Sequence, residues 1–157
     1  PCPCGFLGDS VHRCSCKQAE IDSYKRKISG PLMDRIDMQI NLSRVEFSEL
    51  KTKEKGEASA AIRERVVKAR LVQQERLEAV GIHCNAQMGR SEVVKYCQLD
   101  AAAQNVMERY FNMLNLSARS HDRILKVART IADLAGSESI EAVHLAEAIQ
   151  LRTSVRP

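Results

Sequence analysis

Residues 36–42 are the only segment of this chain in which apolar and polar side chains alternate over several residues. The apolar positions are Ile36, Met38, Ile40 and Leu42, and the polar positions between them are Asp37, Gln39 and Asn41. A period of two residues is typical of a half-buried β-strand. One strand is not stable without a partner strand, and the sequence has no second candidate. We therefore expect the chain, which begins at Pro1 without Met, to be a fragment whose other strands lie N-terminal to it.

Most of the remaining chain has apolar side chains at the three-to-four-residue spacing of helices. We expect helices over 17–28, 57–80 and 91–97, and three more that begin after Asp100, Ser117 and Ser139. The apolar stripe expected on the longest helix is Ala58, Ala61, Ile62, Val66, Ala69, Val72, Leu77 and Val80. Ser91, Asp100 and Ser117 can cap helix N-termini, and Gly81 and Gly136 can end helices in the left-handed conformation.

The composition of the sequence changes near residues 45–56, and we expect the segment from Phe47 to Gly56 to be a charged connector with a single helical turn. The sequence therefore predicts two parts. Residues 1–50 contain a cysteine-rich loop, a helix and one strand, and residues 51–157 form a bundle of helices. The predicted fold class is mainly α.

Composition excludes several classes of protein. No run reaches the roughly 18 apolar residues of a membrane span, and no signal peptide is visible, so we expect no membrane partner and a cytoplasmic location. The net charge of +4 permits contact with nucleic acid without requiring it. Aromatic residues make up only 4% of the chain and Trp is absent, which argues against a base-stacking surface.

Four of the six cysteines lie within the first sixteen residues. They form two C-x-C pairs, Cys2 with Cys4 and Cys14 with Cys16. Without an export signal the compartment is expected to be reducing, and four thiolates in two chelating pairs suit a tetrahedral Zn²⁺ ion. Two alternatives are free thiols in a flexible loop and a site in which His12 replaces one cysteine. Cys84 and Cys97 have no predicted function.

Two arginines are candidates for contact with phosphate. Arg35 follows Gly30-Pro31 at the start of the expected strand, and its guanidinium has the planar set of donors that fits phosphate oxygens. Arg119 lies in the first turn of the helix after Ser117, where the helix dipole attracts anions. The alternatives are a structural ion pair of Arg35 with Asp34 or Asp37 and a solvated surface position for Arg119.

Several segments, taken in order, resemble the C-terminal part of the magnesium-chelatase-like AAA+ ATPases, the ComM/YifB group. These segments are Pro1-Cys2-Pro3-Cys4-Gly5, the run from Ile28 to Asp37 that reads ISGPLMDRID, Cys84-Asn85-Ala86-Gln87, Leu116-Ser117-Ala118-Arg119, the run from Arg123 to Leu134 that reads RILKVARTIADL, and the run from His144 to Gln150 that reads HLAEAIQ. The resemblance extends over nearly the whole chain.

The resemblance implies a multi-part protein with a Lon-protease-like domain, an AAA+ core and a helical lid. Residues 1–50 would then be the end of the AAA+ core, with the last strand of its sheet, and residues 51–157 the lid. Arg35 would be the arginine finger that reaches ATP held by a neighbouring subunit, with Asp34 orienting it. Arg119 would be the sensor-2 arginine that contacts ATP of its own subunit.

The same resemblance implies that the full-length protein forms a hexameric ring that hydrolyses ATP with Mg²⁺ and drives branch migration on DNA. The chain has neither a G-x-x-x-x-G-K-[ST] loop nor an acidic Mg²⁺-binding motif after a strand. We therefore expect this fragment alone to be inactive.

Two readings from other classes remain open. One is a small zinc-binding nucleic-acid module with a basic face on the longest helix, and the other is a helical interaction module without chemistry. The residues of that basic face would be Arg63, Arg65, Lys68, Arg70 and Arg76. Glutamates alternate with these cations, which is typical of a solvated helix face.

Overall fold

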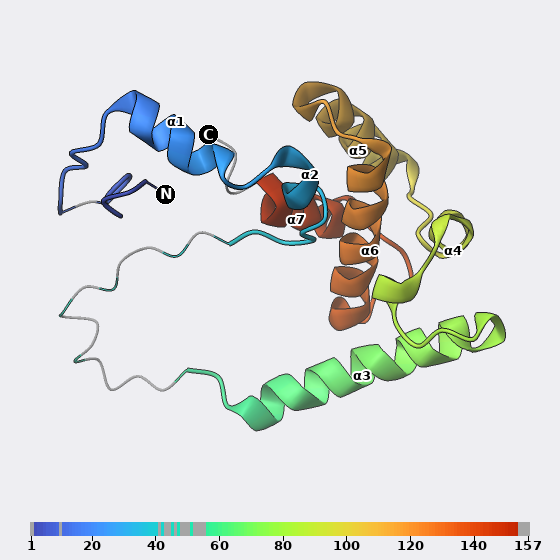
Figure 1. Ribbon diagram of the computed structural model, residues 1–157. Helices are drawn as coiled ribbons and strands as arrows, with labels where there is room; N and C mark the ends of the chain where they lie inside the picture. Colours follow the sequence, from blue (N-terminus) through green and yellow to red (C-terminus); the bar gives the residue numbers. More distant parts are fainter. Residues whose placement is uncertain are drawn as a thin grey trace. The chain divides into compact units, whose positions relative to one another are not determined.

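The computed structural model describes residues 2–9, 11–40, 42, 45, 47, 51 and 56–153. Contacts divide the chain into two compact units, one of Pro1–Ile36 with Asn41–Lys53 and one of Asp37–Ile40 with Glu54–Pro157. Figure 1 shows a helical chain, which confirms the predicted fold class. The first unit contains α1 (Gln18–Arg26) and α2 (Gly30–Met33). The second contains α3 (Ser59–Leu77), the 3₁₀ turns Glu78–Val80 and Asn85–Gln87, α4 (Arg90–Tyr96), α5 (Ala101–Leu114), α6 (Ala118–Ala135) and α7 (Ala142–Thr153).

The strand expected over 36–42 is not formed by the described residues of that segment. One backbone hydrogen bond is present, in which the N–H of Gln39 donates to the carbonyl of Leu151 in α7 at 2.6 Å. A strand needs a neighbouring strand for its other backbone groups, and the described part of the chain supplies none. The β-type pairing found among the described residues is an isolated parallel bridge between Leu99 and Ile140.

The core of the second unit lies where α6 packs against α7. Helices α3 and α4 also pack against α6, and α5 packs against α7. Its fully buried members include Leu77, Val93, Ile124, Leu145 and Ile149. Two helices have the predicted N-caps. Asp100 Oδ1 accepts the N–H of Ala103 at 2.7 Å, and Ser117 Oγ accepts the N–H of Ser120 at 3.1 Å.

In the second unit, two of the helix ends predicted at glycines are confirmed, and one predicted N-cap is wrong. Gly81 and Gly136 have φ angles of 70° and 72°, which is the left-handed conformation expected of them. Ser91 is not a cap, because α4 begins one residue earlier. Its N-cap is Gly89, whose N–H donates to Glu92 Oε2 at 2.7 Å.

The apolar stripe predicted for α3 is wrong over most of its length. Among the predicted positions only Ala69 and Leu77 are buried, and they share their face with Gln73. Ile62 and Val66 are 41% and 45% exposed. The first turns of α3 project beyond the other helices of the unit (Figure 1), so the spacing of apolar residues there does not correspond to a buried face.

A buried ionic network joins α3, the Asn85–Gln87 turn and α6. The carboxylate of Asp133 is fully buried and accepts hydrogen bonds from Arg76, Arg129 and Asn85. The distances are 3.1 Å from Arg76 Nη1, 3.0 Å from Arg129 Nε and 2.8 Å from Asn85 Nδ2. The backbone N–H of Asn85 also donates to Gln73 Oε1 at 3.3 Å. A buried carboxylate is stable only when it is paired and fully hydrogen-bonded, so this network fixes the three elements relative to one another.

Candidate functional site

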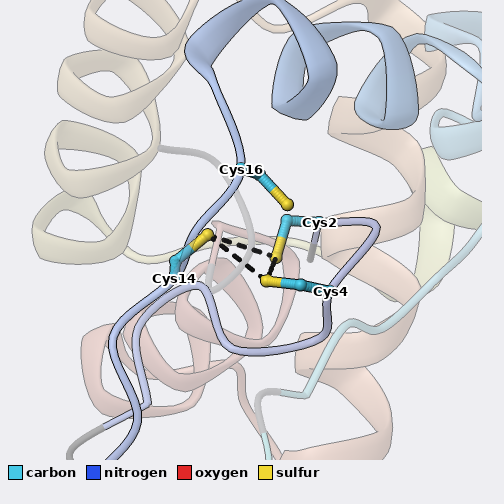
Figure 2. Close-up of side chains that lie close together, drawn as sticks. All are labelled: Cys2, Cys4, Cys14 and Cys16. Carbon is cyan, nitrogen blue, oxygen red and sulfur yellow. Dashed lines mark hydrogen bonds between the residues drawn. The ribbon is translucent and has the colours of Figure 1, made fainter.

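The four N-terminal cysteines converge on one point of the first unit, as Figure 2 shows. Cys2 Sγ lies 3.3 Å from Cys4 Sγ, and Cys14 Sγ lies 3.6 Å from each of them. With Cys16 included, all four sulfur atoms lie within 4.8 Å of one another. The structure therefore brings together the whole set that the C-x-C spacing selected.

A closed loop brings the two pairs together. The N–H of Gly5 donates to the carbonyl of Cys2, and Gly5 and Gly8 both have a φ of 84°, which strains residues with a side chain. The carboxylate of Asp9 then accepts the backbone N–H groups of Val11 and His12 at 2.8 and 2.7 Å. These turns reverse the chain between Cys4 and Cys14.

His12, the alternative ligand, lies outside the cluster of sulfur atoms. Its ring stacks on the ring of Phe6 at a centroid distance of 5.0 Å, and its Nδ1 lies 3.8 Å from Asp9 Oδ1. The imidazole thus belongs to the loop and not to the sulfur cluster.

The thiols of the cluster differ in acidity. Backbone N–H groups of Phe6 and Ser15, followed by the Cys2 thiol, lower the pKa of Cys4 to about 6. The N–H of Cys4 lowers the pKa of Cys16, but desolvation and the neighbouring thiols outweigh it and raise that pKa to about 12. Backbone N–H donors thus favour the ionised form of Cys4, whereas desolvation and the neighbouring thiols favour the protonated form of Cys16.

The other two cysteines, Cys84 and Cys97, belong to the second unit. Cys97 is buried in the core, where burial raises the pKa of its thiol to about 11. Its sulfur lies 4.0 Å from the sulfur of Met88. This surrounding is that of an inert core thiol.

Arg35 follows α2, a single turn with Ser29 as its N-cap and Pro31 in its first positions. Ser29 Oγ accepts the N–H of Leu32 at 3.3 Å. The guanidinium of Arg35 is exposed, and one of its nitrogens donates to the carbonyl of Pro31 at 3.1 Å. Asp37, one of the two aspartates considered as a partner for Arg35, pairs instead with Arg123 of α6.

Arg119 is exposed in the first turn of α6 and has no hydrogen-bond or ion-pair partner among the described residues. It borders a groove of about 800 Å³ that lies within the second unit. Apolar side chains in its lining include Met38, Met88, Val93, Val127, Ile131, Leu134 and Leu151. Its cations are Arg90, Arg119, Arg123 and Lys126, and its carboxylates are Asp37, Asp122 and Glu147.

Of the four cations that line the groove, only Arg119 was predicted from the sequence as a candidate site residue. Arg123 pairs with Asp37, Arg90 pairs with Asp122, and Lys126 Nζ donates to the carbonyl of Ala86 at 3.3 Å. The available signal was the spacing of 119, 123 and 126 on one face of a helix. Arg35 lies in the first unit and Arg119 in the second.

The basic face considered for nucleic-acid binding on α3 is largely neutralised by the chain itself. Arg65 Nη1 lies 2.6 Å from Glu57 Oε1, and Lys68 Nζ lies 2.8 Å from Glu64 Oε1. Arg76 forms an ion pair with the buried carboxylate of Asp133.

Among the described helices none is long and apolar enough to cross a membrane.

Comparison with known proteins gives matches over both parts of the chain. Residues 56–152 match the family described as magnesium chelatase, subunit ChlI C-terminal, and residues 1–50 match magnesium chelatase, subunit ChlI. The chain is 39% identical over 157 residues to competence protein ComM of Haemophilus influenzae, covering 99% of this chain and 30% of that protein. It is 35% identical over 153 residues to YifB of Escherichia coli, covering 97% of this chain and 29% of that protein.

YifB of Salmonella typhimurium is 34% identical over 153 residues, with 97% of this chain and 29% of that protein covered. The chain thus spans about 30% of the length of these relatives. The family model for the C-terminal region alone covers more than half of the chain. On these matches the chain belongs to the magnesium-chelatase-like family, within the group that contains ComM and YifB.

Proposed function

We propose that this chain is the C-terminal part of one subunit of an ATP-hydrolysing ring. In this ring Arg35 acts as the arginine finger and Arg119 as the sensor-2 arginine. The observation that supports it best is the exposed guanidinium of Arg119, without a partner among the described residues, at the edge of a groove of about 800 Å³. A cation left unpaired beside a groove suits an anionic ligand.

The position of Arg119 suits the phosphates of a nucleotide for a second reason. The backbone N–H groups of the first turn of α6 and the helix dipole favour negative charge at that end of the helix. The groove beside it is lined by apolar side chains and by four cations, two of which, Arg90 and Arg123, are paired with carboxylates of the lining. Its volume lies within the range of typical small-molecule sites. Arg119 would contact the phosphates of ATP bound to its own subunit, and movement of α6 would follow the state of the nucleotide.

Arg35 suits a function at a subunit boundary. One N–H group of its guanidinium is used by the carbonyl of Pro31, which leaves other donors of the exposed fork for an external acceptor. An arginine supplied by a neighbour neutralises charge that develops during phosphoryl transfer and accelerates it by roughly 10³–10⁵. This requires a homo-oligomer, and we propose a hexameric ring.

The chain's own residues fit only part of an ATP site. The phosphate-cradling loop and the ligands of Mg²⁺ are absent from its sequence, so they would belong to the other two thirds of the protein. When bound, ATP with Mg²⁺ would supply the energy for movement. We propose that this movement acts on DNA as branch migration or helicase activity in the cytoplasm, where the free thiols of this chain would remain reduced.

The test uses the full-length protein and the variant Arg35→Ala. We expect ATP hydrolysis to fall by roughly 10³–10⁵, with the dissociation constant for a fluorescent ATP analogue nearly unchanged, because the finger acts on a neighbour's nucleotide. Arg26→Ala, which removes another exposed arginine of the same unit, is the matched control and should hydrolyse ATP normally. An equal loss of nucleotide binding in Arg35→Ala would refute the assignment of Arg35.

A further inference from the structure

We propose that Cys2, Cys4, Cys14 and Cys16 bind one structural Zn²⁺ ion through four thiolates. Zinc in such sites is tetrahedral with Zn–S bonds of about 2.3 Å, which places the sulfur atoms about 3.8 Å apart. The three separations among the sulfur atoms of Cys2, Cys4 and Cys14 are 3.3, 3.6 and 3.6 Å, and no pair of the four exceeds 4.8 Å. The sulfur atoms are therefore placed as ligands of a single ion.

Disulfide bonding does not account for this arrangement. A disulfide requires an S–S distance of about 2.05 Å, and even the shortest separation here is 3.3 Å. Cys14 lies equally far from Cys2 and Cys4, so the thiols do not divide into two bonded pairs. Figure 2 shows the sulfur atoms of Cys2, Cys4 and Cys14 facing one another, with the Cys16 side chain directed at the same point.

The loop that these cysteines close has little else to stabilise it. Phe6 and Leu7 are 38% and 39% exposed, and Val11 is 61% exposed. Among the described residues of this loop, Cys2 is the only one whose apolar side chain is buried. A segment that buries so little apolar surface needs a cross-link to remain ordered, and a metal ion bound by its two ends is such a cross-link.

The donor set selects the kind of metal. Four thiolates in a tetrahedron suit zinc or iron with sulfur, whereas Mg²⁺ and Ca²⁺ prefer oxygen ligands. An iron–sulfur cluster places several iron and sulfide ions between its thiolates and spreads them apart, which conflicts with sulfur atoms 3.3 to 3.6 Å apart. All four positions of the ion would be filled by protein, so the site is structural and has no open position for catalysis.

Cys14 and Cys16 lie on the segment that leads into α1, and Lys17 is the N-cap of that helix. The ion would therefore fix the loop of residues 2–16 to the start of α1. This assignment concerns the first unit and does not depend on the nucleotide chemistry of Arg35 and Arg119.

The experiment is a measurement of metal content in the whole 157-residue chain, purified under reducing conditions and reconstituted with zinc chloride. We expect elemental mass spectrometry to find about one zinc ion per chain. Cys4→Ser and Cys14→Ser should each lose most of this zinc. Cys84→Ser, a half-exposed thiol outside the cluster, is the matched control and should keep all of it.

A second measurement on the unaltered chain applies even if the serine variants fail to fold. X-ray absorption at the zinc edge should show a first shell of four sulfur atoms, and Co²⁺ in place of zinc should give the visible bands of a tetrahedral thiolate site. A first shell with nitrogen or oxygen, no zinc after reconstitution, loss of zinc only in Cys84→Ser, or a sulfide-containing iron chromophore would each overturn the proposal.

Discussion

Asp37 and Arg123 form an ion pair that attaches the segment beginning at Asp37 to the second turn of α6. Arg123 lies one helical turn after Arg119 on the same face of that helix. The backbone hydrogen bond from Gln39 to Leu151 adds a second attachment of this segment, to α7. Residues 37–40 are thus attached to α6 and α7 of the same unit.

The Asp37–Arg123 pair predicts a small coupling energy in the folded chain. Their side chains are 52% and 27% exposed, and exposed pairs contribute little because water screens them. In a double-mutant cycle with Asp37→Ala and Arg123→Ala, we expect about 0.2–1 kcal/mol of coupling in the free energy of unfolding by urea, decreasing with added salt. The same cycle with Asp37→Ala and Arg109→Ala, an exposed residue of α5, should give none. A coupling of zero at low salt for the first pair would show that it is not formed in solution.

Arg119 predicts a defect different from that of Arg35. In the full-length protein, Arg119→Ala should weaken binding of an ATP analogue and reduce hydrolysis together, because this residue would contact the nucleotide of its own subunit. Arg119→Lys should recover part of the binding, since the charge remains while the planar fork is lost. Titration of the analogue and steady-state hydrolysis measure the two quantities. Normal binding in Arg119→Ala would contradict the assignment.

Local features of the fold were predictable from the sequence because they depend on neighbouring residues. The caps Asp100 and Ser117 and the left-handed glycines Gly81 and Gly136 act within one turn of the helix that they begin or end. The convergence of the four cysteines is similar, because a short loop with two turns suffices to join the pairs.

Features that depend on distant partners were not predictable. The alternation at 36–42 indicates a strand only where another strand lies beside it, and the described residues form none. The buried face of α3 is decided by what packs against it, so Gln73 is buried while Val66 is exposed. The partners Asp37 and Arg123 are separated by 86 residues, and no periodicity in the sequence connects them.

The buried carboxylate of Asp133 predicts a large loss of stability when its charge is removed. Asp133→Asn would leave the guanidinium groups of Arg76 and Arg129 close together without a counter-ion in the interior of the second unit. Breaking such a pair from one side costs about 3–5 kcal/mol. Urea unfolding followed by circular dichroism measures this, with Glu108→Gln on the exposed face of α5 as the control that should change by less than about 0.5 kcal/mol. A loss below 1 kcal/mol for Asp133→Asn would mean that the network is open to water in solution.

Removal of zinc predicts a local change that does not reach the helices of the second unit. The cysteines belong to the first unit, so a strong chelator should release the loop of residues 2–16 while the thermal unfolding of α3–α7 stays unchanged. Limited trypsin digestion reports on the loop, because Arg13 and Lys17 flank Cys14 and Cys16 and would become cleavage sites once the ion is gone. Adding zinc back should restore protection, and chelator given to Cys14→Ser should change nothing further. A single cooperative loss of all helical signal on chelation would show instead that the metal centre supports the folding of both units.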